Sequence, residues 1–330
     1  MDHNRRTFLQ AAAAALAAGQ LRAQSTATPT QTVQTRDLDI AYEESGDRQG
    51  FPIVLLHGFP DDVRAFDGVV PPLAKAGHRV LVPYLRGYGP TRFRNASVPR
   101  MAEQAAIGQD VLDFANALAL PRFAVGGFDW GGRAASIAAA LHPERVRAAV
   151  ICGGYLIQNT VFQKGAAPQP APPAVERELW YQWYFNLERG RAGLAKNRRP
   201  LCRLLWETWS PDWHFTDETY NRTAPSFDNP DFVEVVIHSY RHRLGNAPGD
   251  PRFATMEQQL AKRPKISVPS IVLHGADDPL ARPPADSPAE RAMFPALTAR
   301  RVFAGVGHFL PREKPDAVAS AMLELLAATK

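Results

Sequence analysis

The sequence predicts an α/β fold in which a mostly parallel central sheet is flanked by helices and a helical cap is inserted after the sixth strand. Near-continuous aliphatic runs of strand length alternate with helical patterns from residue 36 onward, as is typical of parallel strands buried on both faces. The alternation stops between residues 155 and 265 and then resumes. With 45% hydrophobic and 22% charged residues, the 330-residue chain can bury a large core.

The expected elements follow one another in chain order. Strands are expected over residues 52–56, 79–84, 122–126, 146–152 and 268–273, and helices over residues 101–118 and 130–141. A parallel sheet of this kind binds its ligands at the carboxyl ends of its strands. The residues directly after these runs are therefore the first candidates for a functional site.

The first 23 residues are typical of an export signal. Arg5 and Arg6 precede an Ala-rich apolar run over residues 11–18, which is too short for a membrane span of about 20 residues. Paired arginines followed by Thr-Phe-Leu resemble a twin-arginine signal. We expect cleavage near Ala23, export to the periplasm by the twin-arginine machinery and no stable membrane anchoring. The alternative, an amphipathic helix of the domain, lacks most of its polar face.

The rest of the chain divides into three parts. Residues 24–35 are rich in Thr, Gln and Pro and are expected to form a linker outside the fold. The core is expected over residues 36–154 and 266–330, and the cap over residues 155–265. The cap segment is dense in aromatic residues and arginines, and nothing in it has the pattern of a strand.

Charge and cysteine content exclude several classes of protein. The formal net charge is +5, and the signal contributes three arginines against one aspartate, so the mature chain has too little positive charge to argue for nucleic-acid binding. Two cysteines cannot build a disulfide framework or a zinc cage. An oxidising compartment would allow them to pair. However, Cys152 lies in an apolar strand and Cys202 in a helical stretch, so we expect two separate buried thiols.

A glycine-rich turn at residues 127–132 (Gly-Phe-Asp-Trp-Gly-Gly) joins an expected strand to an expected helix. Small residues two positions before and two after Asp129 permit a sharp turn that lifts the central side chain above the sheet. The familiar version of this turn carries a serine nucleophile. The alternative is a glycine-rich turn in which Asp129 only caps the next helix, and the neighbouring motifs decide between the two.

Two further motifs follow other strands. Residues 57–60 (His-Gly-Phe-Pro) come after the strand at 52–56, where this architecture builds its second oxyanion-hole amide. Asp277 and Asp278 come after the strand at 268–273, and His308 follows in a glycine-containing loop. The chain order is nucleophile, acid, histidine. Either aspartate could orient the histidine.

Together these motifs resemble the α/β-hydrolase superfamily over nearly all of residues 36–329. Residues 57–60, 86–89 (Arg-Gly-Tyr-Gly) and 129–132 look more narrowly like epoxide hydrolases. The resemblance favours Asp278 as the acid, because the family usually carries it three positions after a glycine such as Gly275.

The resemblance extends into the cap. Tyr181 matches the first ring-opening tyrosine of epoxide hydrolases, Tyr240 resembles the second, and Tyr184 is a spare candidate. Aromatic packing of a cap helix on the core is the structural alternative. The chain departs from the family at Phe128, where histidine is common, and at Tyr84, where aspartate is common. Side chains expected to contact substrate in the cleft are His57, Pro60, Phe128, Arg133 and Tyr184.

An aspartate nucleophile suits displacement at saturated carbon, because it is ionised without help and leaves a hydrolysable alkyl ester. The leaving oxygen of an epoxide is strongly basic and needs proton donors, which Tyr181 and Tyr240 would supply. The resemblance therefore implies that Asp129 opens the ring.

The same mechanism requires a second half-reaction. His308, oriented by Asp278, would activate water against the ester, giving a vicinal diol. The backbone amides of Phe59 and Trp130 would stabilise the oxyanion. Metal ions and organic cofactors have no part in this chemistry. The partner is a small-molecule epoxide, and the protein is expected to be a monomer or a homodimer.

Other functions stay open. Trp130 directly follows the nucleophile, as in haloalkane dehalogenases, but Phe59 stands where their second halide donor is often asparagine. Haloacid-type relatives place arginine directly after the nucleophile and again three positions later, and here only Arg133 matches. Another hydrolytic reaction is a further alternative. A non-catalytic ligand-binding or sensor protein usually loses a catalytic residue, whereas all are present here.

Overall fold

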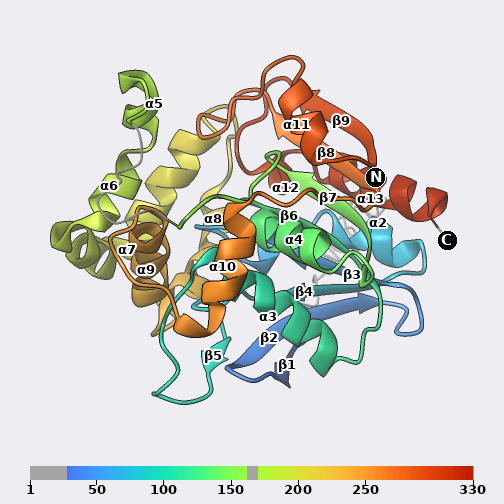
Figure 1. Ribbon diagram of the computed structural model, residues 1–330, viewed down its shortest axis with the longest axis horizontal. Helices are drawn as coiled ribbons and strands as arrows, with labels where there is room; N and C mark the ends of the chain where they lie inside the picture. Colours follow the sequence, from blue (N-terminus) through green and yellow to red (C-terminus); the bar gives the residue numbers. More distant parts are fainter. Residues whose placement is uncertain (1–27, 162–169, 330) are drawn as a thin grey trace, which may run out of the picture.

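The computed structural model of the chain describes residues 28–161 and 170–329 (Figure 1). The expected signal peptide, residues 1–23, lies outside the described residues. Within the described part, no helix combines the length and the apolar character that crossing a membrane requires.

A nine-stranded sheet forms the centre of the described residues, in the order β1-β2-β4-β3-β6-β7-β8-β9, with β5 paired to β2 outside this path. The strands from β4 through β3 to β9 are parallel, and β1, β2 and β5 add antiparallel pairs at one edge. The bounds are β1 (Thr30–Gln34), β2 (Leu38–Gly46), β3 (Pro52–Leu56), β4 (Arg79–Pro83), β5 (Arg92–Phe93), β6 (Phe123–Phe128), β7 (Val146–Cys152), β8 (Ser270–Gly275) and β9 (Leu297–Phe303).

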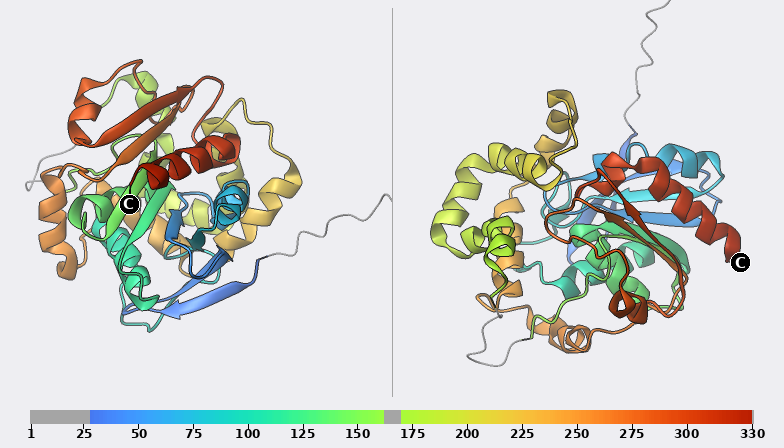
Figure 2. Two further views of the ribbon diagram at one scale, coloured as in Figure 1. Left: turned by 90° about the vertical axis from the view of Figure 1, so that its right-hand side faces the viewer. Right: turned by 90° about the horizontal axis from the view of Figure 1, so that it is seen from above.

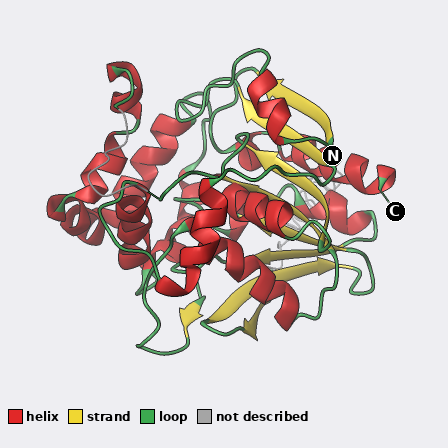
Figure 3. Cartoon of the chain, viewed as in Figure 1, coloured by secondary structure: helices red, strands yellow, loops and turns green. Residues whose placement is uncertain are grey.

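Helices cover both faces of the sheet, as Figure 1 and Figure 3 show. One face carries α3 (Gln104–Ala117) and α4 (Asp129–Leu141), and the other carries α2 (Val70–Lys75) and α13 (Pro315–Ala328). Shorter elements are η1 (Val63–Phe66), α11 (Pro288–Met293) and α12 (Leu310–Glu313). The strands β3, β6 and β8 are almost entirely buried, which explains their unbroken aliphatic sequence. The predicted fold class is confirmed.

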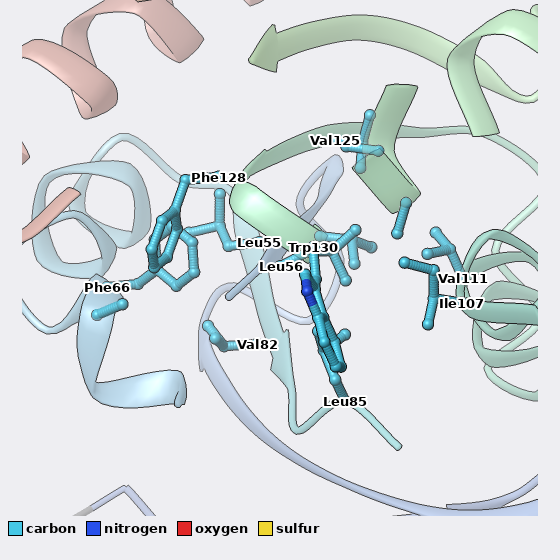
Figure 4. Close-up of a cluster of buried hydrophobic side chains, with 14 of the residues drawn as sticks. Leu55, Leu56, Phe66, Val82, Leu85, Ile107, Val111, Val125, Phe128 and Trp130 are labelled. Carbon is cyan, nitrogen blue, oxygen red and sulfur yellow. The ribbon is translucent and has the colours of Figure 1, made fainter. Parts of the chain in front are cut away.

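The two side chains that flank the central aspartate of the turn enter the core on different sides. Figure 4 shows Phe128 beside Phe66, whereas Trp130 extends past Leu56 toward Leu85. Phe128 and Trp130 are both almost completely buried. The turn between β6 and α4 is therefore anchored by a large aromatic side chain on each side.

The insertion between β7 and β8 is helical, as predicted, and most of it lies to one side of the sheet (Figure 2). It contains α5 (Pro173–Glu178), α6 (Trp180–Asn186), α7 (Glu188–Trp209), α8 (Asp217–Thr223), η2 (Ala224–Asp228), α9 (Phe232–Arg243), η3 (Pro251–Phe253) and α10 (Ala254–Ala261). The insertion follows β7, which is the sixth strand in chain order if the two-residue β5 is not counted. Its last helix, α10, lies against the core, where Glu257 accepts a hydrogen bond of 2.9 Å from the amide of Ala105 in α3.

The prediction that residues 24–35 form a linker outside the fold is wrong for the C-terminal part of this segment. Residues 30–34 form β1, which pairs antiparallel with β2, and Thr32 is opposite Ala41. The side chains of β1 alternate between exposed and half-buried. An edge strand of this kind needs few apolar residues. A strand rich in Thr and Gln can therefore not be distinguished from a linker by its composition.

Two other expectations are confirmed. The expected strands at residues 52–56 and 146–152 have the bounds of β3 and β7. Cys152 in β7 and Cys202 in α7 are both buried and free.

Candidate active site

The site is built around Asp129, at the junction of β6 and α4. Its φ angle is 49°, in the left-handed region that side chains rarely adopt. A Cβ atom added to Gly127 would lie 2.6 Å from the backbone of Gly131, and one added to Gly131 would lie 2.0 Å from the carbonyl oxygen of Leu56. The two glycines therefore allow this turn to pass close to β3.

The two carboxylate oxygens of Asp129 have different surroundings. Oδ1 accepts a hydrogen bond of 2.8 Å from the backbone amide of Phe59. Oδ2 lies 3.7 Å from Nε2 of His308. Burial would raise the pKa of Asp129, but His308, Arg133 and the Phe59 amide outweigh burial and lower it. The carboxylate is therefore ionised at neutral pH, with one oxygen bound and the other facing the histidine.

His308 lies between two carboxylates. Its Nδ1 is 2.9 Å from Oδ2 of Asp278, whose other oxygen accepts a hydrogen bond of 2.9 Å from the amide of Leu280. Asp277 instead accepts from the amide of Gly305 at 2.7 Å. Burial alone would lower the pKa of His308, but Asp278 and Asp129 raise it to about 10.

The backbone around His308 is held by groups that the sequence analysis did not identify. The His308 amide donates to the carbonyl oxygen of Trp209 at 3.0 Å. Ser210 accepts from the Phe309 amide at 3.1 Å and donates to Glu313 at 2.6 Å. Trp209 ends α7 and Ser210 follows it, so the cap holds part of the loop that carries the histidine.

The tyrosines Tyr181 of α6 and Tyr240 of α9 meet in the cap above the nucleophile. Their ring centroids are 5.4 Å apart and the rings are nearly perpendicular, at 89°. Tyr181 accepts a hydrogen bond of 3.1 Å from the side-chain amide of Gln182, which leaves the phenolic hydrogen free for donation. Burial raises the pKa of both phenols, so both keep their protons at neutral pH.

The aromatic packing that was the alternative for these tyrosines is also present. The ring centroid of Tyr240 lies 5.5 Å from that of Phe59, and the ring centroid of Tyr181 lies 4.7 Å from that of Trp209. Packing and a role at the site are thus compatible in this cap.

Asp129, His308, Asp278 and Tyr181 open onto one cavity of about 120 Å³. Its lining comes from both core and cap: Asp129, Arg133, Cys152, Gly153, Leu156, Gln158, Leu179, Tyr181, Gln182, Arg243, Asp278, Leu280, Ala281 and His308. The predicted contact residue Arg133 is among them. Arg243 was missed, although it follows Tyr240 by three positions and therefore shares its face of α9.

The other four predicted contact residues do not line this cavity. His57 is fully buried. Its Nε2 accepts a hydrogen bond of 3.0 Å from the backbone amide of Leu85, and its Nδ1 lies 3.1 Å from the carbonyl oxygen of Gly58. Burial lowers the pKa of His57 to about 4. The imidazole is thus a neutral bridge between two backbone segments.

Structural contacts, rather than contact with the cavity, also account for Pro60, Phe128 and Tyr184. The carbonyl oxygen of Pro60 accepts from the indole of Trp206 at 2.6 Å. Phe128 packs against Phe66 and the ring of His308, and so lies behind the histidine. Tyr184 is half-buried, and its ring centroid is 5.8 Å from that of Trp180.

The Trp130 side chain is fully buried, with its ring stacked 5.7 Å from that of Phe59. The role of the Trp130 amide in an oxyanion hole stays a prediction. Residues 28–161 and 170–329 contain no group of three or more His, Cys, Asp or Glu side chains that could hold a metal ion.

The sheet order, the strained turn and the acid–histidine pair are those of a hydrolase built on an α/β sheet. A family model for the alpha/beta hydrolase fold matches residues 52–315, and the chain belongs to this family.

Individual relatives indicate which members of this family the chain is similar to. A crystal structure of a candidate epoxide hydrolase from Klebsiella pneumoniae subsp. pneumoniae is 42% identical, with a TM-score of 0.84, and the match covers 90% of this chain and 96% of that one. Haloalkane dehalogenase 1 of Mycobacterium bovis is 34% identical over 84% of both chains. Epoxide hydrolase B of Mycobacterium tuberculosis is 32% identical over 159 residues, which are 44% of this chain and 42% of that protein. The chain is an epoxide hydrolase-like enzyme of the alpha/beta hydrolase family.

Proposed function

We propose that the enzyme hydrolyses an epoxide to a vicinal diol through an alkyl ester on Asp129. One observation carries this proposal: an ionised carboxylate points an oxygen into a cavity that a histidine–aspartate pair and a protonated phenol also line. A carboxylate attacks saturated carbon, and an epoxide supplies such a carbon with a leaving oxygen that accepts a proton.

In the first half-reaction Oδ2 of Asp129 attacks a ring carbon. Oδ1 is engaged by the Phe59 amide, so Oδ2 is the available nucleophile. The carbon–oxygen bond of the ring breaks, and the departing oxygen takes a proton from Tyr181 or Tyr240. Because burial raises the pKa of both phenols, they act as donors rather than as phenolates.

In the second half-reaction water attacks the ester carbonyl carbon while His308 takes a proton from the water. Esterification removes the negative charge of Asp129, which is one of the groups that raise the pKa of His308. The pKa of the histidine therefore falls when it must act as a base. Oδ1 carries the developing negative charge and keeps its hydrogen bond from Phe59. The bond between the carboxyl carbon and Oδ2 then breaks, and the diol leaves with Oδ2 as one of its hydroxyl oxygens, protonated by His308.

A single turnover in heavy-oxygen water tests the covalent step. With enzyme in excess over styrene oxide, we expect the first diol to carry an unlabelled oxygen from Asp129 and the peptide containing Asp129 to gain the label. In His308→Gln, intact-mass spectrometry should show enzyme enlarged by the mass of the epoxide. A labelled diol with an unlabelled Asp129 peptide contradicts the proposal.

Dehalogenation is the second candidate reaction. It is supported by the similarity to haloalkane dehalogenase 1. Halide release from 1-chlorobutane or 1,2-dibromoethane without diol formation from any epoxide would favour it.

We also propose that the chain is exported to the periplasm. Arg5 and Arg6, followed by the apolar run of residues 11–18, support the twin-arginine route. In a bacterium with this route, exchange of both arginines for lysine should leave the protein in the cytoplasmic fraction, whereas the unchanged sequence should appear in the periplasmic fraction. Equal periplasmic amounts of the lysine variant and the unchanged protein would contradict export by the twin-arginine route.

A further inference from the structure

Two arginines meet at the cavity, one from the core and one from the cap. Arg133 lies four positions after Asp129 on α4, and Arg243 lies three positions after Tyr240 on α9. Residues three or four apart share a helix face. Each helix therefore presents one group of the proposed reaction and, one turn further on, a guanidinium group, and both arginines line the cavity.

Neither guanidinium has a carboxylate partner within the described residues. Arg133 is 6% exposed, and its Nε donates to the carbonyl oxygen of Leu156 at 3.0 Å. The guanidinium carbon of Arg243 lies 4.8 Å from the ring centroid of Tyr240, and its buried Nη2 has no hydrogen-bond partner in the described part of the chain. Burial and the charge of Arg243 lower the pKa of Arg133 to about 9, so Arg133 still carries its charge at neutral pH.

The charges around the cavity do not balance. The titratable residues of its lining with full charges are Asp129 and Asp278 on one side and Arg133, Arg243 and His308 on the other. One positive charge is left over in a partly desolvated space. Such a charge is unfavourable unless a negative group pairs with it, and one monovalent anion would neutralise it.

We propose that the substrate is a short epoxy acid whose carboxylate binds between Arg133 and Arg243. This inference rests on the proposed epoxide hydrolysis. A guanidinium group matches a carboxylate with two parallel hydrogen bonds. Asp129 and Arg133 line the same small cavity, so a substrate that contacts both carries its carboxylate on or close to the ring. A cavity of about 120 Å³ has room for a small acid, and the single surplus charge fits a carboxylate rather than a doubly charged phosphate.

Glycidate and glycidamide test the proposal, because they have nearly the same shape and differ in charge. For the purified full chain we expect kcat/KM for diol formation to favour glycidate by about 10- to 100-fold, as hydrogen bonds to charged groups provide. Arg133→Gln and Arg243→Gln should each reduce this preference, mainly by raising KM for glycidate. Arg191→Gln is the control: it removes an exposed arginine of α7 that pairs with Glu234, and the preference for glycidate should be unchanged in this variant.

Calorimetric binding of propanoate and propanamide separates the anion site from the reaction. Propanoate should bind more tightly than propanamide, and Arg243→Gln should reduce the difference. Arg243 is half-buried, so this variant tests the site even if Arg133→Gln does not fold. Selective propanoate binding without diol from either epoxide would support the anion site and reject epoxide hydrolysis. Equal use of the two epoxides, or a preference that is undiminished in Arg243→Gln, would overturn the anion site and leave epoxide hydrolysis standing.

Discussion

The core half and the cap half of the site hold their reactive groups in different ways. In the core, Asp129 and Asp278 lie at strand ends, and backbone amides of Phe59 and Leu280 donate to them. In the cap, Tyr181 and Tyr240 lie on helices within a cluster of aromatic rings. A buried carboxylate needs hydrogen-bond donors to stay ionised, whereas a phenol that must stay protonated is helped by an apolar environment.

This contrast separates two tasks. The core half provides charge, and its geometry is fixed by turns that only glycine permits. The cap half provides protons and, with Arg243, a second face of the cavity. Substitutions of Asp129 and His308 in the core should therefore abolish turnover, whereas those in the cap should reduce it and change which substrates are used.

Replacement of Asp129 by asparagine should have the largest effect. We expect kcat for diol formation to fall by about 10⁴-fold or more, since loss of a nucleophile removes the covalent route altogether. Steady-state diol production measures this, and the circular dichroism spectrum of the variant should match that of the unchanged protein. Full turnover in Asp129→Asn would exclude the core half as the source of the nucleophile.

Replacement of Tyr240 by phenylalanine should have a smaller effect. The ring keeps its packing against Phe59, but the proton donor is lost, so we expect kcat to fall by about 100-fold. Tyr181→Phe should behave similarly. Tyr184→Phe is the matched control for Tyr181→Phe, because Tyr184 lies on the same helix but does not line the cavity. Tyr240 is not among the lining residues either, but its ring centroid lies 5.4 Å from that of Tyr181. If all three variants lose activity equally, the loss reflects packing of the cap rather than proton donation.

The pH dependence of stability should show the smallest effect. The pKa of His308 is raised from 6.5 to about 10 in the folded chain, so its protonated form stabilises the fold fully below pH 6.5. This stabilisation is lost as pH rises through about 10. The Tm of the unchanged protein should therefore exceed that of His308→Gln by roughly 2 to 6 °C more at pH 6 than at pH 10. A Tm difference independent of pH would show that the carboxylates do not raise this pKa.

Much of the core half could be predicted from sequence because its signals are local. A strand, a glycine and a reactive residue are adjacent in the chain, so Asp129 and His308 could be recognised before their contacts were known. The choice of Asp278 needed a family resemblance, because Asp277 is equally close in sequence. Only the structure shows Asp277 bonded to Gly305 instead.

The cap half and the surroundings of the core could be predicted less well because their contacts are distant in sequence. Arg243 reaches the cavity by packing of α9 over the sheet, and its spacing from Tyr240 in the sequence indicates only that the two share a helix face. His57 belongs to a recognisable motif, but its ring turns into the core to bind the amide of Leu85. The strand β1 was missed because a polar edge strand resembles a linker in composition.

The hydrogen bond from His308 to the carbonyl oxygen of Trp209 means that the cap is not an interchangeable module. An enzyme engineer who grafts a different insertion onto this sheet to change selectivity would also remove the backbone support of the general base. Such a chimera needs residues equivalent to Trp209 and Ser210 at the end of its grafted helix, or turnover will decline for every substrate alike.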